Sequence, residues 1–253
     1  MRTVILLFLF FICQSNLKAQ QWNLVWADEF SSSQINTTNW TYDLGGDGWG
    51  NNELQNYTNS NDNSTISNDN LLIIAKQQQF NGNAYTSARL KTQGLQSWRF
   101  GKIEARIKLP MQKGLWPAFW MIGNNITSIG WPKCGEIDIM EHVNTENKVH
   151  GTIHWDNNGH NYYGGQTPAN IEGQYHIYSI EWNPDSIKWL MNGIKYWSAN
   201  IANNINNTEE FQNPFFIILN VAVGGNWPGS TDNTTVLPDT MFVDYVRVYQ
   251  QFK

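Results

Sequence analysis

The sequence contains very little cysteine, and this limits how the fold can be stabilised. Its two cysteines are Cys13 and Cys134, in a chain of 253 residues. Cys13 lies in a segment that we expect to be removed on export, which leaves Cys134 without an intrachain partner. The predicted fold must therefore be stabilised by its core rather than by disulfides, and a chain of this length can bury a sufficient core. We expect Cys134 to be a small, buried packing residue.

The sequence also has no long apolar run. Its longest, residues 4–12, has nine residues, whereas a membrane-spanning helix needs about 20. A short basic start precedes this run, and a polar stretch ending in Ala19-Gln20 follows it. These three parts are typical of a secretory signal peptide. We predict a signal peptide over residues 1–19 and a mature domain over 20–253, secreted to the periplasm or the cell exterior. A lipoprotein anchor at Cys13 is disfavoured, because bulky Ile12 precedes it.

Basic residues are scarce as well. The chain has 16 Lys and Arg against 21 Asp and Glu, a net charge of −5. Loss of residues 1–19 removes Arg2 and Lys18 but no acid, so the mature chain carries −7. This charge does not favour binding to nucleic acid or to an anionic membrane surface. We expect neither partner. The mature chain has no internal repeat or linker, and we expect one domain and a monomer.

Strand patterns dominate the mature chain. Between residues 102 and 109, apolar residues alternate with charged ones, which is typical of an antiparallel strand with one buried face. Asn192-Gly193 separates two short apolar segments, 187–191 and 194–197, and is a strong hairpin signal. Only residues 201–211 could form a short helix. Many short strands with Asn, Gly and Pro turns predict an all-β sandwich or barrel, with further strands at 71–76, 86–92, 116–122, 149–155, 176–182, 215–223 and 241–249.

Three acids interrupt one of the apolar strand segments, residues 135–141. On a regular strand, Glu136 and Asp138 share one face, and the next residue on that face is Met140 rather than Glu141. One extra residue, a β-bulge, would return Glu141 to the face of the other two, and bulges recur beside active sites. Three acids on one face repel one another and add nothing to packing, so this arrangement indicates a functional role.

The chemistry that fits these acids is glycoside hydrolysis. A retaining glycosidase needs a nucleophilic carboxylate and a carboxylic acid as proton donor, about 5–5.5 Å apart. Asp138, between the two glutamates, could hydrogen-bond the nucleophile and raise the pKa of the proton donor through like-charge coupling. The alternatives are a calcium site or a solvated, charged strand.

Tryptophan is abundant, and this indicates a sugar ligand. The sequence has 13 tryptophans, and several lie next to Gly or Pro in loop-like settings. Flat indole faces suit the apolar faces of sugar rings, while the N–H can still reach a hydroxyl. We expect Trp40 and Trp182 to be core residues. We expect Trp120, Trp131 and Trp227 to contact sugar.

In this setting the sequence resembles the family sixteen glycoside hydrolases, in particular the bacterial laminarinases. The resemblance covers nearly the whole mature chain and rests on an ordered set of segments, which are WADEF (26–30), GWGNNELQ (48–55), SARL (87–90), GLWPAFWM (114–121), GWPKCGEIDIME (130–141), GTIHW (151–155), NVAVGGNWPG (220–229) and VDYVRVY (243–249).

The resemblance implies a β-jelly-roll sandwich of two antiparallel sheets with a concave, sugar-binding cleft. It implies that Glu136 is the nucleophile, that Asp138 supports it and that Glu141 is the acid/base. His154 matches a histidine near the acid/base that tunes Glu141 or contacts sugar; the alternative is a strand histidine without a role. Glu53 either binds a hydroxyl or braces its loop. The resemblance also places several residues in the cleft, namely Asn52 and Arg89 on its glycone side and Trp116, Trp120, Trp131 and Trp227 along it.

No cofactor is expected for catalysis, but the resemblance implies one structural calcium on the convex side. The matching ligands are the backbone carbonyls of Glu29 and Asn70 and the side chain of Asp244. Oxygen ligands of this kind suit a hard cation. The alternative is that these residues merely cap turns.

The resulting prediction is a secreted, endo-acting, retaining hydrolase of β-1,3-glucan, with side activity on mixed-linkage β-1,3-1,4-glucan. The acidic and aromatic surroundings of the acids, apart from Arg89 and Lys133, argue against a sulfated substrate. An agarase or carrageenase on the same fold is one alternative. A non-catalytic β-glucan-binding protein is the other, although both glutamates are present here. Transglycosylation is not excluded as a minor activity.

Overall fold

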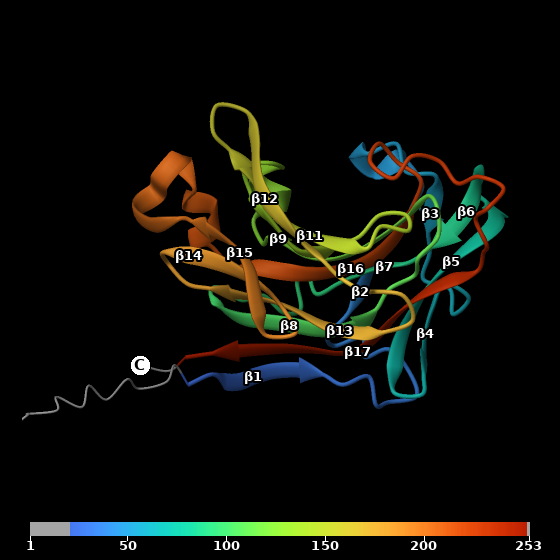
Figure 1. Cartoon of the computed structure of the whole chain (residues 1–253), viewed down its shortest axis with the longest axis horizontal. Coiled ribbons are helices and arrows are strands. Elements are labelled where there is room, and N and C mark those ends of the chain that lie inside the picture. Colours follow the sequence, from blue (N-terminus) through green and yellow to red (C-terminus); the bar gives the residue numbers. More distant parts are fainter. Residues whose placement is uncertain (1–20, 252–253) are drawn as a thin grey trace, which may run out of the picture.

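The computed structural model describes residues 21–251, which form two sheets packed face to face (Figure 1). The predicted signal peptide, residues 1–19, and the first residue of the predicted mature domain lie outside this range. The larger sheet has ten strands in the order β15-β14-β13-β8-β17-β5-β6-β3, with β1 paired to β17 and β4 to β5. These strands are β1 (Asn23–Asp28), β3 (Gln55–Tyr57), β4 (Ser64–Ser67), β5 (Asn70–Phe80), β6 (Asn83–Ser87), β8 (Gly101–Lys108), β13 (Tyr175–Trp182), β14 (Ser186–Met191), β15 (Ile194–Asn200) and β17 (Asp239–Gln250).

The smaller sheet has seven strands in the order β12-β11-β10-β9-β16-β7-β2, and its neighbouring strands are antiparallel. These strands are β2 (Thr41–Asp43), β7 (Arg89–Lys91), β9 (Leu115–Gly123), β10 (Glu136–Glu141), β11 (Lys148–Asp156), β12 (His160–Pro168) and β16 (Phe215–Val223). The helices are short turns, which are α1 (Ile126–Ile129), η1 (Gly48–Gly50), η2 (Ala202–Asn207) and η3 (Glu209–Gln212).

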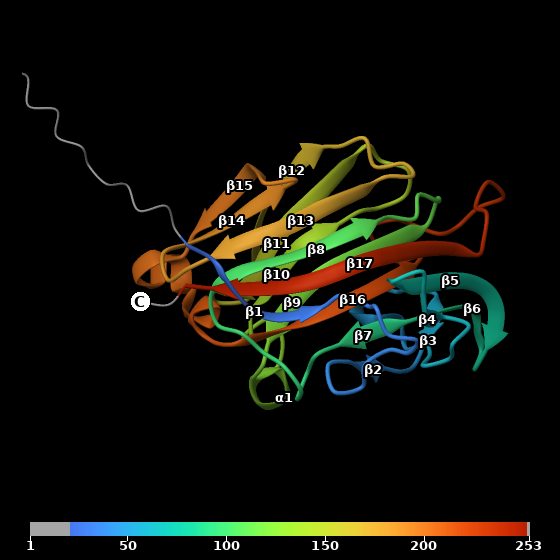
Figure 2. The same cartoon turned by 90° about the horizontal axis from the view of Figure 1, so that it is seen from below.

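The core fills the space between the two sheets. Each strand directs alternate side chains inward, and Ile103, Ala105 and Ile107 of β8 are fully buried, as their alternation with charged residues predicts. Strand β16 is buried along its whole length. Trp40 and Trp182, both predicted to be core residues, are each 1% exposed. Seen from below, strands of the two sheets run in similar directions (Figure 2), the aligned packing of a β-sandwich. The predicted all-β sandwich is therefore confirmed.

The predicted continuous strand over residues 86–92 is wrong. β6 ends at Ser87 and β7 begins at Arg89, and the two strands belong to different sheets. Ala88, between them, is fully buried and is the single residue that joins these strands of the two sheets. The pattern of the sequence could not reveal the change of sheet, since both strands have strand-like composition.

Other differences are smaller. The predicted helix within residues 201–211 consists of the two 3-10 turns η2 and η3, and α1 was not predicted. Strand β12 was also missed, because its sequence is polar and contains two glycines. It lies at the edge of its sheet, where one side needs no partner strand. The Asn192-Gly193 hairpin is confirmed, with Met191 paired to Ile194. Within the described residues, no helix is long and apolar enough to cross a membrane.

Candidate active site

The three acids of β10 lie on one face because the strand contains a bulge. Against β9, Asp138 pairs with Trp120, and the next pair is Met140 with Phe119, so Ile139 has no partner of its own. The pairing with β11 shifts over the same interval. Ile137, Ile139 and Met140 are at most 1% exposed and face the core. The predicted bulge is present, and it leaves Glu136, Asp138 and Glu141 on the opposite face.

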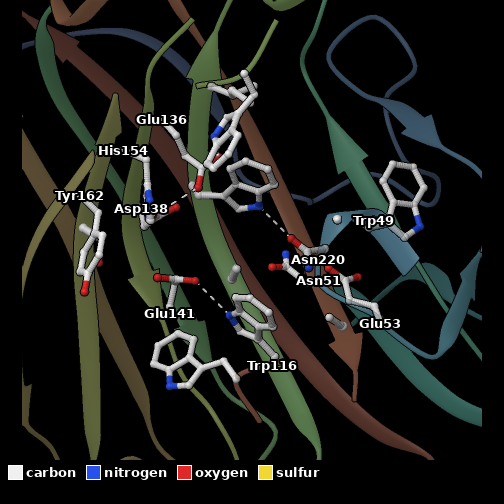
Figure 3. Close-up of a pocket in the computed structure, with 18 of the residues that line it drawn as sticks. Trp49, Asn51, Glu53, Trp116, Glu136, Asp138, Glu141, His154, Tyr162 and Asn220 are labelled. Atoms are coloured by element: carbon white, nitrogen blue, oxygen red, sulfur yellow. Dashed lines mark hydrogen bonds and ion pairs between the residues drawn. The ribbon is translucent and has the colours of Figure 1, made fainter. Parts of the chain in front are cut away.

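That face forms the floor of a cleft of about 620 Å³. Strands β9, β10, β11 and β16 supply the floor, while β12 rises on one side and the turn η1 and the loop after β16 rise on the other (Figure 1). The acids follow one another along β10 in the middle of this cleft (Figure 3). His154 and Tyr162 lie on one side of them, and Asn220, Glu53 and Trp49 on the other. The cleft lining therefore combines carboxylates with aromatic rings.

Each glutamate accepts a hydrogen bond from a tryptophan. The Trp131 indole N–H donates to Glu136 Oε2 at 3.0 Å, and the Trp116 indole N–H donates to Glu141 Oε1 at 3.0 Å. Both tryptophans line the cleft, as the resemblance implies. Their hydrogen bonds to the carboxylates could not be predicted from the sequence, because a tryptophan that contacts sugar and one that holds an acid occur in similar motifs.

His154 lies beside Glu136 and Asp138. Its Nε2 is 3.2 Å from Asp138 Oδ2 and 3.8 Å from Glu136 Oε1, because His154 on β11 is directly opposite Glu136. The structure thus places His154 against Asp138 and Glu136, whereas Glu141 is bonded to Trp116. His154 Nδ1 is 2.8 Å from Nε2 of His160, and the two rings stack. His160 lies on β12 and was not singled out from the sequence.

Burial raises the pKa of all three carboxyls, but their neighbours differ. For Glu136, burial and then the charge of Asp138 raise the pKa to about 8, while His154 and the Trp131 hydrogen bond act in the opposite direction. Burial also raises the pKa of Asp138. The pKa of Glu141 is raised well above its usual range by burial and by the charge of Asp138. The direction of this shift favours the protonated form of Glu141.

A buried polar network supports the other side of the cleft. Glu53 Oε2 accepts hydrogen bonds from the Gln55 amide at 2.6 Å and the Tyr57 hydroxyl at 3.1 Å. Tyr57 in turn accepts from Asn220, whose Oδ1 accepts from the Trp120 indole N–H at 2.8 Å. Glu53 both lines the cleft and braces its loop. Asn220 was missed, although a single polar residue within the apolar strand β16 was a signal that could have identified it.

The remaining predicted sugar-binding residues differ in their positions. Arg89 lines the cleft with its guanidinium 4.7 Å from the ring centres of both Trp49 and Trp120, and it pairs with Asp43 at 3.0 Å. Trp227 lines the cleft, is 41% exposed and contacts the edge of Trp116. Asn52 is exposed and bonds to Asn226 at 2.8 Å. The residues before and after Asn52 line the cleft, and Asn52 itself does not.

Two possible metal sites follow from the predictions. Ligand atoms of Glu136, Asp138 and His154 lie within 4.8 Å of one another, which keeps a metal at the acids as an alternative to catalysis. For the predicted calcium, strand pairing brings Glu29, Asn70 and Asp244 close together.

The surroundings of Asp244 do not suit a calcium ion as they stand. Asp244 Oδ2 accepts a hydrogen bond from Arg106 at 2.6 Å. The side chain of Glu29 is taken up by Arg247, with both carboxylate oxygens at 2.8 Å. A cation at this position would have to compete with the Arg106 guanidinium for the one predicted side-chain ligand.

Comparison with known proteins gives a consistent result. A model of glycosyl hydrolases family 16 matches residues 51–247. The chain is similar to the clotting factor G alpha subunit of Tachypleus tridentatus (45% identity over 234 residues, 91% of this chain and 34% of that protein). It is also similar to a β-glucanase of Rhodothermus marinus (40% over 249 residues, 92% and 87%). The chain thus spans a third or so of the first relative and most of the second. A solved structure, the endo-β-1,3-glucanase of Pyrococcus furiosus, matches with a TM-score of 0.84 and 42% identity over 92% of this chain and 96% of that chain.

Proposed function

Because the chain belongs to glycosyl hydrolase family 16, we propose that it is an endo-acting, retaining hydrolase of β-1,3-glucan, with mixed-linkage β-1,3-1,4-glucan as a second substrate. The observation that carries this proposal is the placement of Glu136 and Glu141 on one face of β10, inside an aromatic cleft, with each carboxyl held by an indole N–H. This pair offers the nucleophile and the proton donor that retention requires.

The reaction proceeds in two displacements. Glu136, as carboxylate, attacks the anomeric carbon while protonated Glu141 gives its proton to the leaving glycosidic oxygen, and a covalent glycosyl ester forms on Glu136. Glu141, now ionised, takes a proton from water, which attacks the same carbon and releases Glu136. The anomeric configuration is inverted twice and is therefore retained.

The surroundings of the two glutamates match these opposite roles. Glu136 has a partner that stabilises its charge, the Trp131 N–H, and His154 lies nearby. Glu141 is buried beside the charge of Asp138, and this raises its pKa and keeps its proton in place until the leaving oxygen needs it. Asp138 contributes its charge to this effect and is itself oriented by His154.

The substrate class follows from the shape and charge of the cleft. An open cleft that exposes Trp131 and Trp227 suits a polymer bound along its length, and indole faces suit neutral sugar rings. Arg89 is already paired with Asp43, which leaves it less available to a sulfate group. The β-glucanase of Rhodothermus marinus and the endo-β-1,3-glucanase of Pyrococcus furiosus, to which this chain is similar, support a glucan as the substrate. A sulfated or plain galactan is the second candidate on this fold.

The test is the release of reducing ends from laminarin, lichenan, agarose and carrageenan by the mature protein. We expect fast release from laminarin, slower release from lichenan, and a steep fall in both with Glu141→Gln. Release from agarose or carrageenan alone would keep the reaction class and overturn the substrate. Binding to glucan in affinity gels without any release would instead identify a glucan-binding protein.

Export and assembly belong to the same proposal. We infer that the protein is secreted after cleavage behind Ala19 and that it acts as a monomer. The mass of the secreted chain tests the cleavage position, and sedimentation tests the assembly. A mass that includes residues 1–19, or a stable dimer at assay concentrations, would contradict these parts.

A further inference from the structure

A second hollow, of about 480 Å³, lies outside the cleft, and its lining residues differ from those of the cleft. Its lining comes from the loop between β9 and β10, from the end of β11, and from the η2–η3 segment. We call it the loop pocket and define it by Asn125, Lys133, Asp156, Glu209 and Glu210. None of these side chains has a role in the proposed reaction.

The loop pocket contains two buried oxygen atoms without a hydrogen-bond donor. Glu210 is 7% exposed, and its Oε1 accepts the backbone N–H of Asp156 at 3.2 Å. Its other oxygen, Oε2, is buried and has no partner, and the same is true of Asn125 Oδ1. Buried oxygens of this kind are costly unless a proton donor or a cation satisfies them. Both residues line the same hollow.

Backbone packing brings a further oxygen to this place. Gly123 and Gly135 lie side by side, with the N–H of Gly123 bonded to the carbonyl of Gly135 at 3.0 Å. A Cβ on Gly123 would be 1.9 Å from the carbonyl oxygen of Cys134 and 2.9 Å from Asn125 Oδ1, so these two oxygens are close neighbours. A Cβ on Gly135 would be 2.9 Å from Cβ of Glu210. Gly123 therefore lets the Cys134 carbonyl and the Asn125 side chain approach each other, and Gly135 lets the backbone approach Glu210.

The charge around the hollow favours a cation. Asp156, Glu209 and Glu210 are acidic, and Lys133 is the basic residue in the lining. Carboxylate, amide and backbone carbonyl oxygens together make the ligand set that Ca²⁺ takes in proteins, with water completing the coordination.

We propose that the loop pocket is a binding site for a divalent cation of the calcium class, with the side-chain oxygens of Glu210 and Asn125 as its ligands from the protein. A cation here would join η3 to the loop that carries Trp131. Since Trp131 donates to the carboxylate of Glu136, the ion would help to hold the Trp131 indole in position. This site is distinct from the calcium implied at Asp244.

The experiment is a titration of the metal-free full-length protein with Ca²⁺ by calorimetry, and with Tb³⁺ by luminescence excited through tryptophan. Trp155 directly precedes Asp156 and provides a nearby donor of excitation. We expect Glu210→Gln to weaken binding by about tenfold or more, the range found when metal sites lose supporting groups. The matched control, Glu209→Gln, removes the same charge next to the proposed ligand, and we expect binding within a factor of about two or three of the unmodified protein.

Two further variants test the proposal independently if Glu210→Gln folds poorly. Asn125→Asp replaces the amide with a carboxylate, and we expect tighter binding and a larger rise of Tm on addition of Ca²⁺. Asp244→Asn removes the side-chain ligand implied by the resemblance, and we expect it to leave loop-pocket binding intact. The absence of Ca²⁺ and Tb³⁺ binding, equal binding by Glu210→Gln, or loss of all binding in Asp244→Asn alone would overturn the proposal.

Discussion

The two ends of β10 carry the same residue type, glutamate, for which we propose opposite roles. At one end Glu136 accepts from Trp131 and faces His154; at the other, Glu141 accepts from Trp116. Both carboxyls are removed from water, and both have one indole donor. The difference between them lies in the neighbouring side chains: Nε2 of His154 is 3.8 Å from Glu136 Oε1, whereas Glu141 is bonded to Trp116. Burial is the largest cause of the raised pKa of both carboxyls, so any difference between their proposed roles must come from the neighbouring side chains.

The largest effect is expected from removal of the nucleophile. Glu136→Ala should lower kcat on laminarin by roughly 10⁴-fold or more, because no other carboxylate can form the glycosyl ester. Added azide should restore turnover of an activated glucoside and give a glycosyl azide of inverted configuration, which product NMR detects. Substantial turnover of laminarin without azide would contradict the assignment.

Removal of the acid/base should have a smaller and more selective effect. Glu141→Gln should lower kcat on laminarin by roughly 10²–10⁴-fold. Because the unmodified enzyme needs Glu141 protonated, activity falls as pH rises through the raised pKa of this group. The variant should therefore lose the alkaline limb of its pH profile. An aryl glucoside with a good leaving group should recover the first displacement, and equal losses on both substrates would argue against proton donation.

A matched pair of tryptophan variants sharpens the comparison. A hydrogen bond to a charged group contributes about 1.5–3 kcal/mol, so Trp131→Phe should lower kcat/KM by roughly tenfold or more. Trp116→Phe should have a smaller effect, about 1 kcal/mol, because Glu141 is protonated in the reactive form. Each lost bond raises the pKa of its own glutamate. Trp131→Phe should thus shift the acid limb to higher pH, whereas Trp116→Phe should shift the alkaline limb to higher pH. Profiles that shift in the same limb would refute the separate roles.

The smallest effect is expected from His160. This residue contacts His154 at 2.8 Å and acts as a positioning residue for it. His160→Phe retains a ring for stacking but loses this polar contact, which is worth about 1 kcal/mol, or about fivefold in kcat. The acid limb should also shift, because His154 influences Glu136. Tyr162→Phe is the control, and an equal change in both variants, or a lower Tm with an unchanged pH profile, would indicate a merely structural role.

Much of the fold and the centre of the site could be predicted because they depend on local spacing. A bulge is needed to bring Glu136, Asp138 and Glu141 to one face of the strand, and the Asn192-Gly193 pair is a local signal for a hairpin. The change of sheet at Ala88 could not be predicted, since it depends on where two strands find partners. The pairing of Asp244 with Arg106 and the buried oxygens of Glu210 and Asn125 were also out of reach, because these contacts join residues far apart in the chain.

The bulge at Ile139 has a consequence for how this strand can change over evolution. On β9, the partners of Asp138, Met140 and Glu141 are three consecutive residues, Trp120 to Ala118. Deletion of Ile139 would therefore leave every other pair in register, with all three acids still alternating against buried apolar residues. Most single deletions in a central strand exchange its two faces. This one would not, so a residue between the proposed catalytic acids can be lost with the strand pairing kept.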